Sequence, residues 1–205
     1  MKILIFSDIH SDLKRLEELM AIEADYYFAA GDMVSWARGL DAAGQILSRR
    51  GEKVFVLPGN HESEGDIEGL CKRHKLNNFH GHSMKVAGYH IGGLGYSNPT
   101  PFDTPGEYSE AELATRLAVF APLQPLILIC HCPPKGTLLD RASPNRHFGS
   151  ASIRQFLDTH QPPYFFCGHI HEAEGASDKI GATVGVNVGK KGYLLEFDKI
   201  TSEPI

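Results

Sequence analysis

The segment Ile3-Leu4-Ile5-Phe6-Ser7-Asp8-Ile9-His10 joins a short apolar run to a carboxylate and an imidazole. A run of four apolar residues that polar residues cut short predicts a strand buried on both faces. The side chains of Asp8 and His10 stand two residues apart, close enough to bind one cation. The segment therefore predicts a buried strand that presents metal-type ligands at its carboxyl end.

Four other predicted strands end in the same way. Residues 26–30, 54–57, 126–130 and 164–167 each form a short apolar run. The residues that follow them are Gly31-Asp32, Gly59-Asn60-His61-Glu62, His131 and Gly168-His169-Ile170-His171. Any one of these would pass for a helix cap or a turn. Five in one chain leave little room for that interpretation, because ligands collect at the carboxyl ends of strands in α/β sheets.

Amphipathic stretches alternate with these strands. Helices are predicted over residues 12–20, 40–50, 67–74 and 149–160, and another begins at Ser109 with a capping box to Glu112. Hairpins are predicted over residues 83–96 and 182–197, and loops over residues 98–106 and 132–148. The alternation predicts an α/β fold. Because no linker or repeat interrupts it, we expect one domain over residues 1–205.

The composition narrows the classes of protein that fit. Of the 205 residues, 42% are apolar and 22% charged, which is enough for a buried core and argues against disorder. The net charge of −5 argues against duplex DNA as the main partner. No apolar run is long enough for a membrane span, and the N-terminal run is read as a strand rather than a signal peptide. We therefore expect a cytoplasmic protein, whose four cysteines form no disulfide framework.

Seven oxygen and nitrogen ligands follow the five strands: Asp8, His10, Asp32, Asn60, His131, His169 and His171. This number exceeds the needs of one tetrahedral zinc and suits two ions that share a carboxylate. The set contains no thiolate, which favours Mn, Fe or Zn in an open hydrolytic pair over a closed structural zinc. Cys130 and Cys132 flank His131, but on a strand their side chains point the opposite way, into the core.

The order of these motifs resembles that of the calcineurin-like metallophosphoesterase superfamily, which carries D-x-H, G-D, G-N-H-[DE], H and G-H-x-H along the chain. The resemblance covers residues 3 to about 190. The sequence around His131 and His169 is most similar to that of small bacterial and archaeal members and of class III cyclic-nucleotide phosphodiesterases. The sequence departs from the pattern at Ser35, where the family often has an Asp or Asn that supports the metal ligands. The resemblance implies a four-layer αββα sandwich of two mixed sheets flanked by helices.

The resemblance also implies two divalent metal ions and a role for each ligand. The first ion would be bound by Asp8, His10, Asp32 and His171, and the second by Asp32, Asn60, His131 and His169. Asp32 would bridge the two ions, which would be Mn, Fe or Zn, with Ni or Co possible in vitro. His61 would be the catalytic residue outside the metal shell, contacting the phosphate and donating a proton to the leaving group.

These residues predict a metal-dependent phosphoesterase, in which a hydroxide that bridges two cations attacks phosphorus. The resemblance to the cyclic-nucleotide enzymes favours phosphodiesters over phosphomonoesters, with cyclic nucleotides among the candidate substrates. One alternative is a catalytically silent protein-interaction scaffold of the same fold, against which the presence of His61 argues. A nuclease is the third interpretation, against which the short and acidic chain argues. The sequence does not indicate an oligomeric state.

Substrate choice is expected to depend on the loops 96–106 and 135–150. The second loop follows His131, and its Arg146 and His147 are the predicted substrate contacts, although loop charges that only face solvent fit the sequence equally well. Asn98 and Trp36 stay open between a substrate contact and a structural role.

Overall fold

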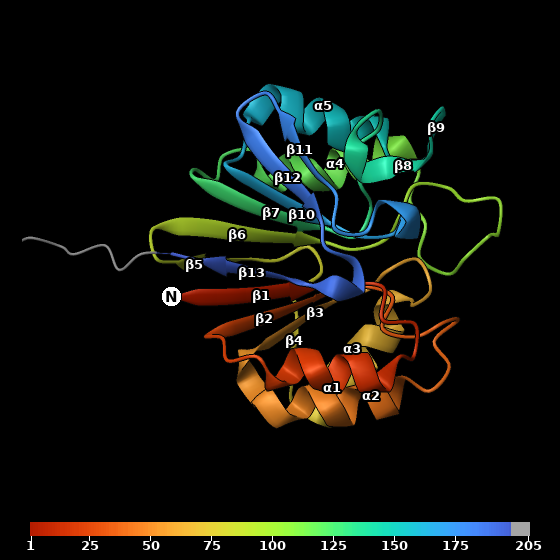
Figure 1. Cartoon of the computed structure of the whole chain (residues 1–205), viewed down its shortest axis with the longest axis vertical. Helices are drawn as coiled ribbons and strands as arrows, with labels where there is room; N and C mark the ends of the chain where they lie inside the picture. The colour runs from red at the N-terminus through yellow and green to blue at the C-terminus, as the bar shows by residue number, and fades with distance from the viewer. Residues whose placement is uncertain (198–205) are drawn as a thin grey trace, which may run out of the picture.

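The computed structural model describes residues 1–197, which form two β-sheets packed face to face with helices on both outer faces (Figure 1). The first sheet has the strand order β13-β1-β2-β3-β4 and contains β1 (Lys2–Phe6), β2 (Tyr26–Ala30), β3 (Val54–Leu57), β4 (Asn77–Asn78) and β13 (Tyr193–Glu196). The second has the order β11-β12-β10-β7-β6-β5 and contains β5 (Ser83–Val86), β6 (Tyr89–Leu94), β7 (Leu126–Cys130), β10 (Tyr164–Cys167), β11 (Ser177–Ile180) and β12 (Thr183–Asn187).

Both sheets are mixed, because antiparallel strands flank parallel ones. In the first sheet β13 alone runs antiparallel, and in the second sheet β11 and β5 do. The first sheet is covered by α1 (Leu13–Ala21), α2 (Leu40–Leu47) and α3 (Glu64–His74), and the second by α4 (Glu110–Leu117) and α5 (Ala151–His160). The predicted αββα sandwich of two mixed sheets is confirmed.

The central strands are continuous apolar runs because both of their faces are buried. In β1, Ile3 and Ile5 pack between the sheets, while Leu4 and Phe6 pack toward the helices. In β7, residues 127 and 129 lie between the sheets, whereas Leu126, Leu128 and Cys130 join the core under α4 and α5. All four cysteines are buried, as the sequence predicted for Cys130 and Cys132.

Helix boundaries follow local capping chemistry. The predicted capping box of Ser109 and Glu112 opens α4. A second box, formed by Ser63 and Asp66, starts α3 at Glu64, three residues before the predicted start. Helix α2 ends at Leu47, and residues 48–53 form a 3₁₀ segment, η1 (Ser48–Lys53), around the positive φ of Gly51.

The predicted hairpin over residues 182–197 is wrong. Strand β12 pairs with β11 and β10 in the second sheet, whereas β13 pairs with β1 in the first. The true hairpin is β11–β12. The sequence reading missed β11 because this edge strand, Ser-Asp-Lys-Ile, has a single apolar residue.

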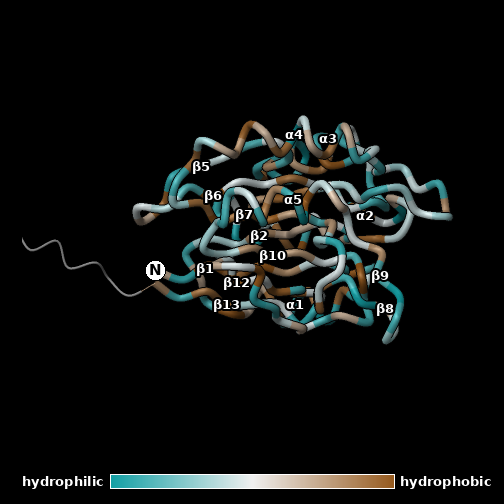
Figure 2. The backbone as a smooth tube through the Cα atoms, turned by 90° about the horizontal axis from the view of Figure 1, so that it is seen from above, coloured by the Kyte–Doolittle hydropathy of each residue, from teal (hydrophilic) through white to brown (hydrophobic). Residues whose placement is uncertain are grey.

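The predicted loop 132–148 contains short elements of its own. These are η3 (Leu138–Asp140), β8 (Arg141–Ser143) and β9 (Arg146–His147). The trace around β8 and β9 is hydrophilic and lies at the periphery of the molecule in Figure 2. Strands β1, β2, β3, β7 and β10 all have their carboxyl ends on this side of the molecule, opposite the N-terminus (Figure 1). Within residues 1–197 no helix is both long enough and apolar enough to cross a membrane.

Candidate metal centre

The seven predicted ligands gather at the shared carboxyl end of the five strands. The donor atoms of six of them, all but Asn60, together with His61 form three groups, within each of which all atoms lie within 4.8 Å of one another. The groups are Asp8 with His10 and His171, His10 with Asp32 and His61, and Asp32 with His131 and His169. His10 and Asp32 each belong to two groups, so the three groups form one continuous cluster.

The first half of the cluster surrounds His10. Its Nε2 lies 3.0 Å from Nε2 of His171 and 3.6 Å from Oδ2 of Asp32. The Nε2 of His171 is 3.5 Å from Oδ1 of Asp8. Asp8 also accepts a hydrogen bond from the backbone N–H of His169 at 3.0 Å, which joins the two metal-type segments of β1 and β10.

The second half surrounds the amide oxygen of Asn60. This oxygen lies 2.9 Å from Nδ1 of His169 and 3.1 Å from Nε2 of His131. The same His131 nitrogen is 3.4 Å from Oδ2 of Asp32. The amide nitrogen of Asn60 donates to the hydroxyl of Thr104 at 3.1 Å, which turns the oxygen toward the histidines.

The donor set fits divalent cations. Adjacent ligands of an ion with bonds of about 2.0–2.2 Å stand about 3.0–3.5 Å apart, close to the spacings measured here. The Nε2 atoms of His10 and His171, which face each other at 3.0 Å, have the spacing of two adjacent ligands of one cation. The residues therefore fit the metal ions that the sequence predicted; their number and identity stay predictions.

Neighbouring groups orient the imidazoles. Nδ1 of His131 donates to the carbonyl oxygen of Ala30 at 3.0 Å, which leaves Nε2 facing the cluster. Nδ1 of His10 lies 3.1 Å from the hydroxyl of Ser35. Ser35 thus contacts a predicted ligand from the position where similar sequences have Asp or Asn. Such outer partners fix the ring orientation and tautomer of metal-binding histidines.

The charge state of the cluster suits cation binding. Burial alone would raise the pKa of Asp32, but the charge and hydrogen bond of His131 hold it well below its usual range. Burial lowers the pKa of His169 to about 4, so this imidazole is neutral, as a ligand must be. Burial also favours a neutral His131, but the carboxylates of Asp32 and Asp8 raise its pKa to about 9. A cation would have to displace that proton.

Glu62 is a positioning residue that the sequence reading left without a role. Its buried carboxylate accepts backbone hydrogen bonds from Asp32 at 3.0 Å, Val34 at 3.1 Å and Gly59 at 2.9 Å. It therefore fastens the segment after β2 to the segment after β3. The signal was present in the sequence, as the fourth residue of Gly59-Asn60-His61-Glu62. Thr104, by contrast, gave no signal, because only the fold brings it to Asn60.

His61 lies at the edge of the cluster with one ring nitrogen already engaged. The backbone N–H of Trp36 donates to Nδ1 of His61 at 3.3 Å. This bond requires Nδ1 to be the unprotonated nitrogen of the neutral ring, so Nε2 carries the proton. The indole of Trp36 stands edge-on to the imidazole, with ring centroids 5.6 Å apart.

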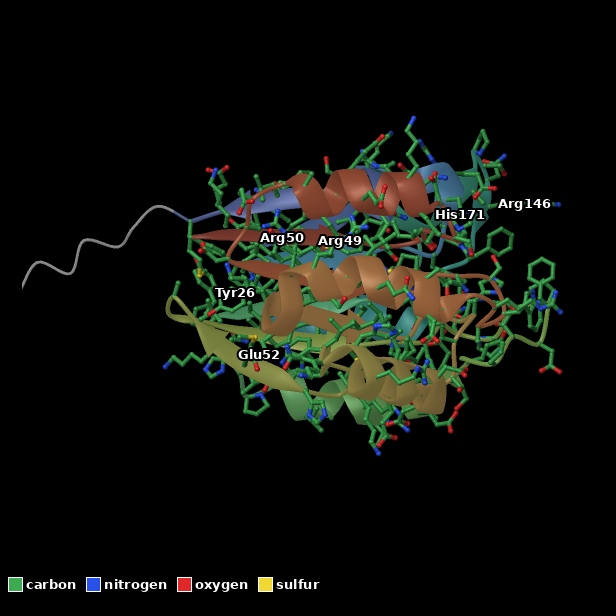
Figure 3. All side chains as sticks on the ribbon, turned by 90° about the horizontal axis from the view of Figure 1, so that it is seen from below. Tyr26, Arg49, Arg50, Glu52, Arg146 and His171 are labelled. Carbon is green, nitrogen blue, oxygen red and sulfur yellow. The ribbon has the colours of Figure 1, made fainter. Side chains whose placement is uncertain are left out.

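A cleft of about 590 Å³ opens beside the cluster. Its walls come from Asp32, Asn60, His61 and His169, and from both loops that were expected to govern substrate choice. His147 and Asn98 are lining residues, whereas Arg146 and Trp36 are not among them. In Figure 3, Arg146 lies at the outer margin of the molecule, at the same end as His171. A substrate contact by Arg146 stays a prediction.

Comparison with known proteins identifies the family. A family profile described as calcineurin-like phosphoesterase matches residues 1–173. The chain belongs to this family. As a calcineurin-like phosphoesterase it is a metal-dependent hydrolase of phosphate esters, and the resemblance seen in the sequence is confirmed.

Individual relatives agree with the calcineurin-like fold. An uncharacterized protein of Methanocaldococcus jannaschii is 32% identical over 201 residues, which cover 95% of this chain and 91% of that protein. A solved structure from Thermus thermophilus has a TM-score of 0.70 at 20% identity and covers 92% of this chain and 88% of its own. The structure of a novel archaeal phosphodiesterase has a TM-score of 0.53 at 14% identity, with coverages of 92% and 84%.

Proposed function

We propose that the protein is a phosphodiesterase that works with two divalent cations. The observation that carries the proposal is the cluster itself, in which seven donor side chains from five strand ends, Asp32 among them, lie together beside the imidazole of His61. Manganese, iron or zinc are the proposed ions, and small phosphodiesters, cyclic nucleotides included, are the proposed substrates. When bound, the two cations would acidify a water molecule and neutralise phosphate oxygens.

The protein's own residues would supply orientation and a hydrogen bond. Asp32 contacts both halves of the ligand cluster, so its carboxylate would serve both ions. Asn60 offers a neutral oxygen, which keeps the site positive and attractive to an anionic ester. His61, held through Nδ1 by the backbone of Trp36, would donate a hydrogen bond from Nε2 to the departing alcohol oxygen and so stabilise the negative charge that develops there.

The walls of the cleft support a diester rather than a monoester. A phosphomonoester is a dianion, to which cationic side chains make strong charge-assisted hydrogen bonds. Among the described residues that line the cleft there is one lysine, Lys135, and no arginine. Phe102, Phe148 and two prolines supply apolar surface that suits the second ester substituent of a diester.

Two variants test the assignment of roles. His61→Ala should retain its metal but lose about 10²- to 10³-fold in kcat, the usual contribution of a positioned hydrogen-bond donor. Asp32→Ala should lose both activity and metal, because one carboxylate serves both halves of the cluster. Metal content by elemental analysis and turnover of bis-p-nitrophenyl phosphate are the measurements. Equal loss of metal in the two variants would show that His61 is a ligand, which its proximity to His10 and Asp32 makes a real alternative.

The substrate preference has a separate test. The protein reconstituted with Mn, Fe, Zn, Ni or Co should hydrolyse bis-p-nitrophenyl phosphate with a higher kcat/KM than p-nitrophenyl phosphate. A higher value for the monoester would reverse the proposed preference. Failure to hydrolyse either ester with any of the five metals would overturn the proposed activity and favour the interaction-scaffold interpretation.

A further inference from the structure

Two exposed phenylalanines stand on opposite loops of the cleft. Phe102 comes from the loop after β6 and is 71% exposed, and Phe148 follows β9 and is 50% exposed. Large apolar side chains that remain exposed on the walls of a pocket mark a binding surface. An aromatic ring is also a stacking platform for any flat substituent, whatever hydrogen bonds that substituent makes.

A polar side chain beside Phe148 lines the same cleft. The imidazole of His147 lines the cleft, and its Nδ1 donates to Oδ1 of Asp140 at 2.7 Å. The Nε2 of the same ring is therefore the nitrogen left for a ligand.

The carboxylate of Asp140, which accepts the hydrogen bond of this imidazole, is itself fixed by backbone groups. Asp140 is fully buried and accepts backbone N–H bonds from Gly136 at 3.1 Å, Thr137 at 2.9 Å and Gly149 at 3.0 Å. Burial would raise the pKa of Asp140, but the hydrogen bonds from His147 and the backbone lower it, so the carboxylate is ionised. A ring tied to a carboxylate that is itself fixed by three backbone groups is preorganised toward the cleft.

We infer that this part of the cleft is a subsite for the planar aromatic substituent of the phosphodiester, a nucleobase or an aryl ring. The ring stacks on Phe102 and Phe148, and Nε2 of His147 makes a hydrogen bond to a polar group of the same substituent, such as a sugar hydroxyl. The cleft volume of about 590 Å³ lies within the usual range for small-molecule pockets, about 300–1,000 Å³. Stacking without base-edge contacts tolerates all bases, so the subsite selects flat rings rather than one nucleotide. The inference rests on the proposed phosphodiesterase function.

The test compares two diesters with the same leaving group. The p-nitrophenyl ester of thymidine 5′-monophosphate carries a base, whereas methyl p-nitrophenyl phosphate does not. We expect the wild-type protein to have a higher kcat/KM for the thymidine ester. Phe102→Ala and Phe148→Ala should each reduce this preference by about 5- to 150-fold, the equivalent of about 1–3 kcal/mol per stacked base, because the methyl group has no ring to stack.

Matched variants separate stacking from general damage. Phe148→Tyr keeps a ring and should keep the preference. Val119→Ala truncates another exposed apolar residue, one on the helical side of the molecule, and should change neither substrate. His147→Ala should also lower the preference; an equal loss with both esters would show instead that His147 acts at the phosphate. Equal kcat/KM values for the two esters in the wild-type protein would overturn the subsite.

A binding measurement distinguishes failure of the subsite from failure of the proposed function. Calorimetric titration of the manganese-loaded protein with thymidine 5′-monophosphate and with inorganic phosphate needs no hydrolysis. Phe102→Ala and Phe148→Ala should weaken the nucleotide and leave phosphate unaffected. Weaker nucleotide binding in the variants, with no hydrolysis by the wild-type protein, would support the subsite and contradict the proposed phosphodiesterase activity. Hydrolysis by the wild-type protein, with unaltered nucleotide affinity in both variants, would contradict the subsite alone.

Discussion

Four predicted metal ligands lie on left-handed backbone, which is costly for residues other than glycine. The φ angles are 56° at Asp8, 46° at His10, 54° at Asp32 and 69° at His169. Each such residue costs on the order of 1–3 kcal/mol and persists only where its surroundings enforce it. Here the surroundings include Gly59, where a Cβ would overlap the Asp32 carboxylate. The strained backbone at the cluster thus lowers the stability of the fold, and it sets the direction in which the ligand side chains point.

His80 makes stability depend on pH away from the cluster. Its Nδ1 accepts the backbone N–H of Gly95 at 2.9 Å, and its Nε2 lies 3.0 Å from the hydroxyl of Tyr108. Burial, aided by the charge of Arg116, lowers its pKa to about 4. The unfolded chain, with an ordinary pKa near 6.5, therefore binds the proton more readily. Neutral His80 makes its full contribution to the free energy of unfolding above pH 6.5. This contribution is lost as the pH falls toward 4, and the loss between pH 7.5 and 5.0 is about 2 kcal/mol.

The measurement is the free energy of unfolding in urea at these two pH values. His80→Gln cannot be protonated, so its loss of stability on acidification should be smaller than that of the wild type by about 2 kcal/mol. His90→Gln, at a half-buried position on β6, should behave like the wild type. The same acid sensitivity in His80→Gln and the wild type would show that His80 is not the responsible group.

At the scale of elements, the buried strands and the ligands that follow them were predictable from sequence. The runs at residues 26–30, 54–57 and 126–130 coincide with β2, β3 and β7, because a strand buried on both faces leaves a continuous apolar signal. Parallel strands bring their carboxyl ends together. The sequence therefore predicts one cluster for residues as distant as Asp8 and His171, which stand 163 positions apart.

Local sequence could not predict which distant strands pair or which distant side chains meet. The apolar run Tyr193-Leu194-Leu195 indicates a strand but does not say which neighbour it pairs with, and β13 pairs with β1 rather than β12. The same limit applies to supporting residues. Thr104 reaches Asn60 and Asp140 reaches His147 through loop geometry that no short motif encodes.

Asn187, at the end of β12, connects two loops of the site. Its amide nitrogen lies within 3.0–3.2 Å of the carbonyl oxygens of Leu139, Gly168 and Ile170, which flank the His147 loop and His169. Asn187→Ala removes the donor that these three carbonyls share, although Gly168 and Ile170 each keep a backbone donor, and should lower the free energy of unfolding by about 1–3 kcal/mol. It should also weaken metal binding, measured by calorimetric titration, because the segment that carries His169 and His171 loses its anchor.

Thr183, on the same strand, offers the control. Its buried hydroxyl has no hydrogen-bond partner among the described residues. Thr183→Val keeps the shape and removes an unsatisfied polar group, so it should leave stability unchanged or raised and metal binding intact. Unchanged metal affinity in Asn187→Ala would assign Asn187 to folding alone.

At the scale of the molecule, the ligand cluster spans the boundary between the two sheets. Asp8, His10, Asp32 and Asn60 follow strands of the first sheet, and His131, His169 and His171 follow strands of the second. Contacts across this boundary join the carboxylates of the first sheet to imidazoles of the second, Asp8 to His171 and Asp32 to His131. Cations bound there would therefore link the two halves of the sandwich as well as serve hydrolysis.

Metal binding should consequently stabilise the whole fold. A ligand that binds only the folded state at about 100 times its Kd adds about 2.7 kcal/mol, which in a chain of this size raises Tm by about 5–10 °C. We expect manganese to produce this shift in calorimetry and a chelator to reverse it. Asp32→Ala should melt at one temperature with or without manganese, whereas His61→Ala should show the wild-type shift, because His61 is proposed to stand outside the metal shell. The two variants thus separate metal-dependent stability from catalysis. If Asp32→Ala still melted at a higher temperature with manganese, the stabilising ion would bind elsewhere, and a metal link between the sheets would not explain the rise in Tm.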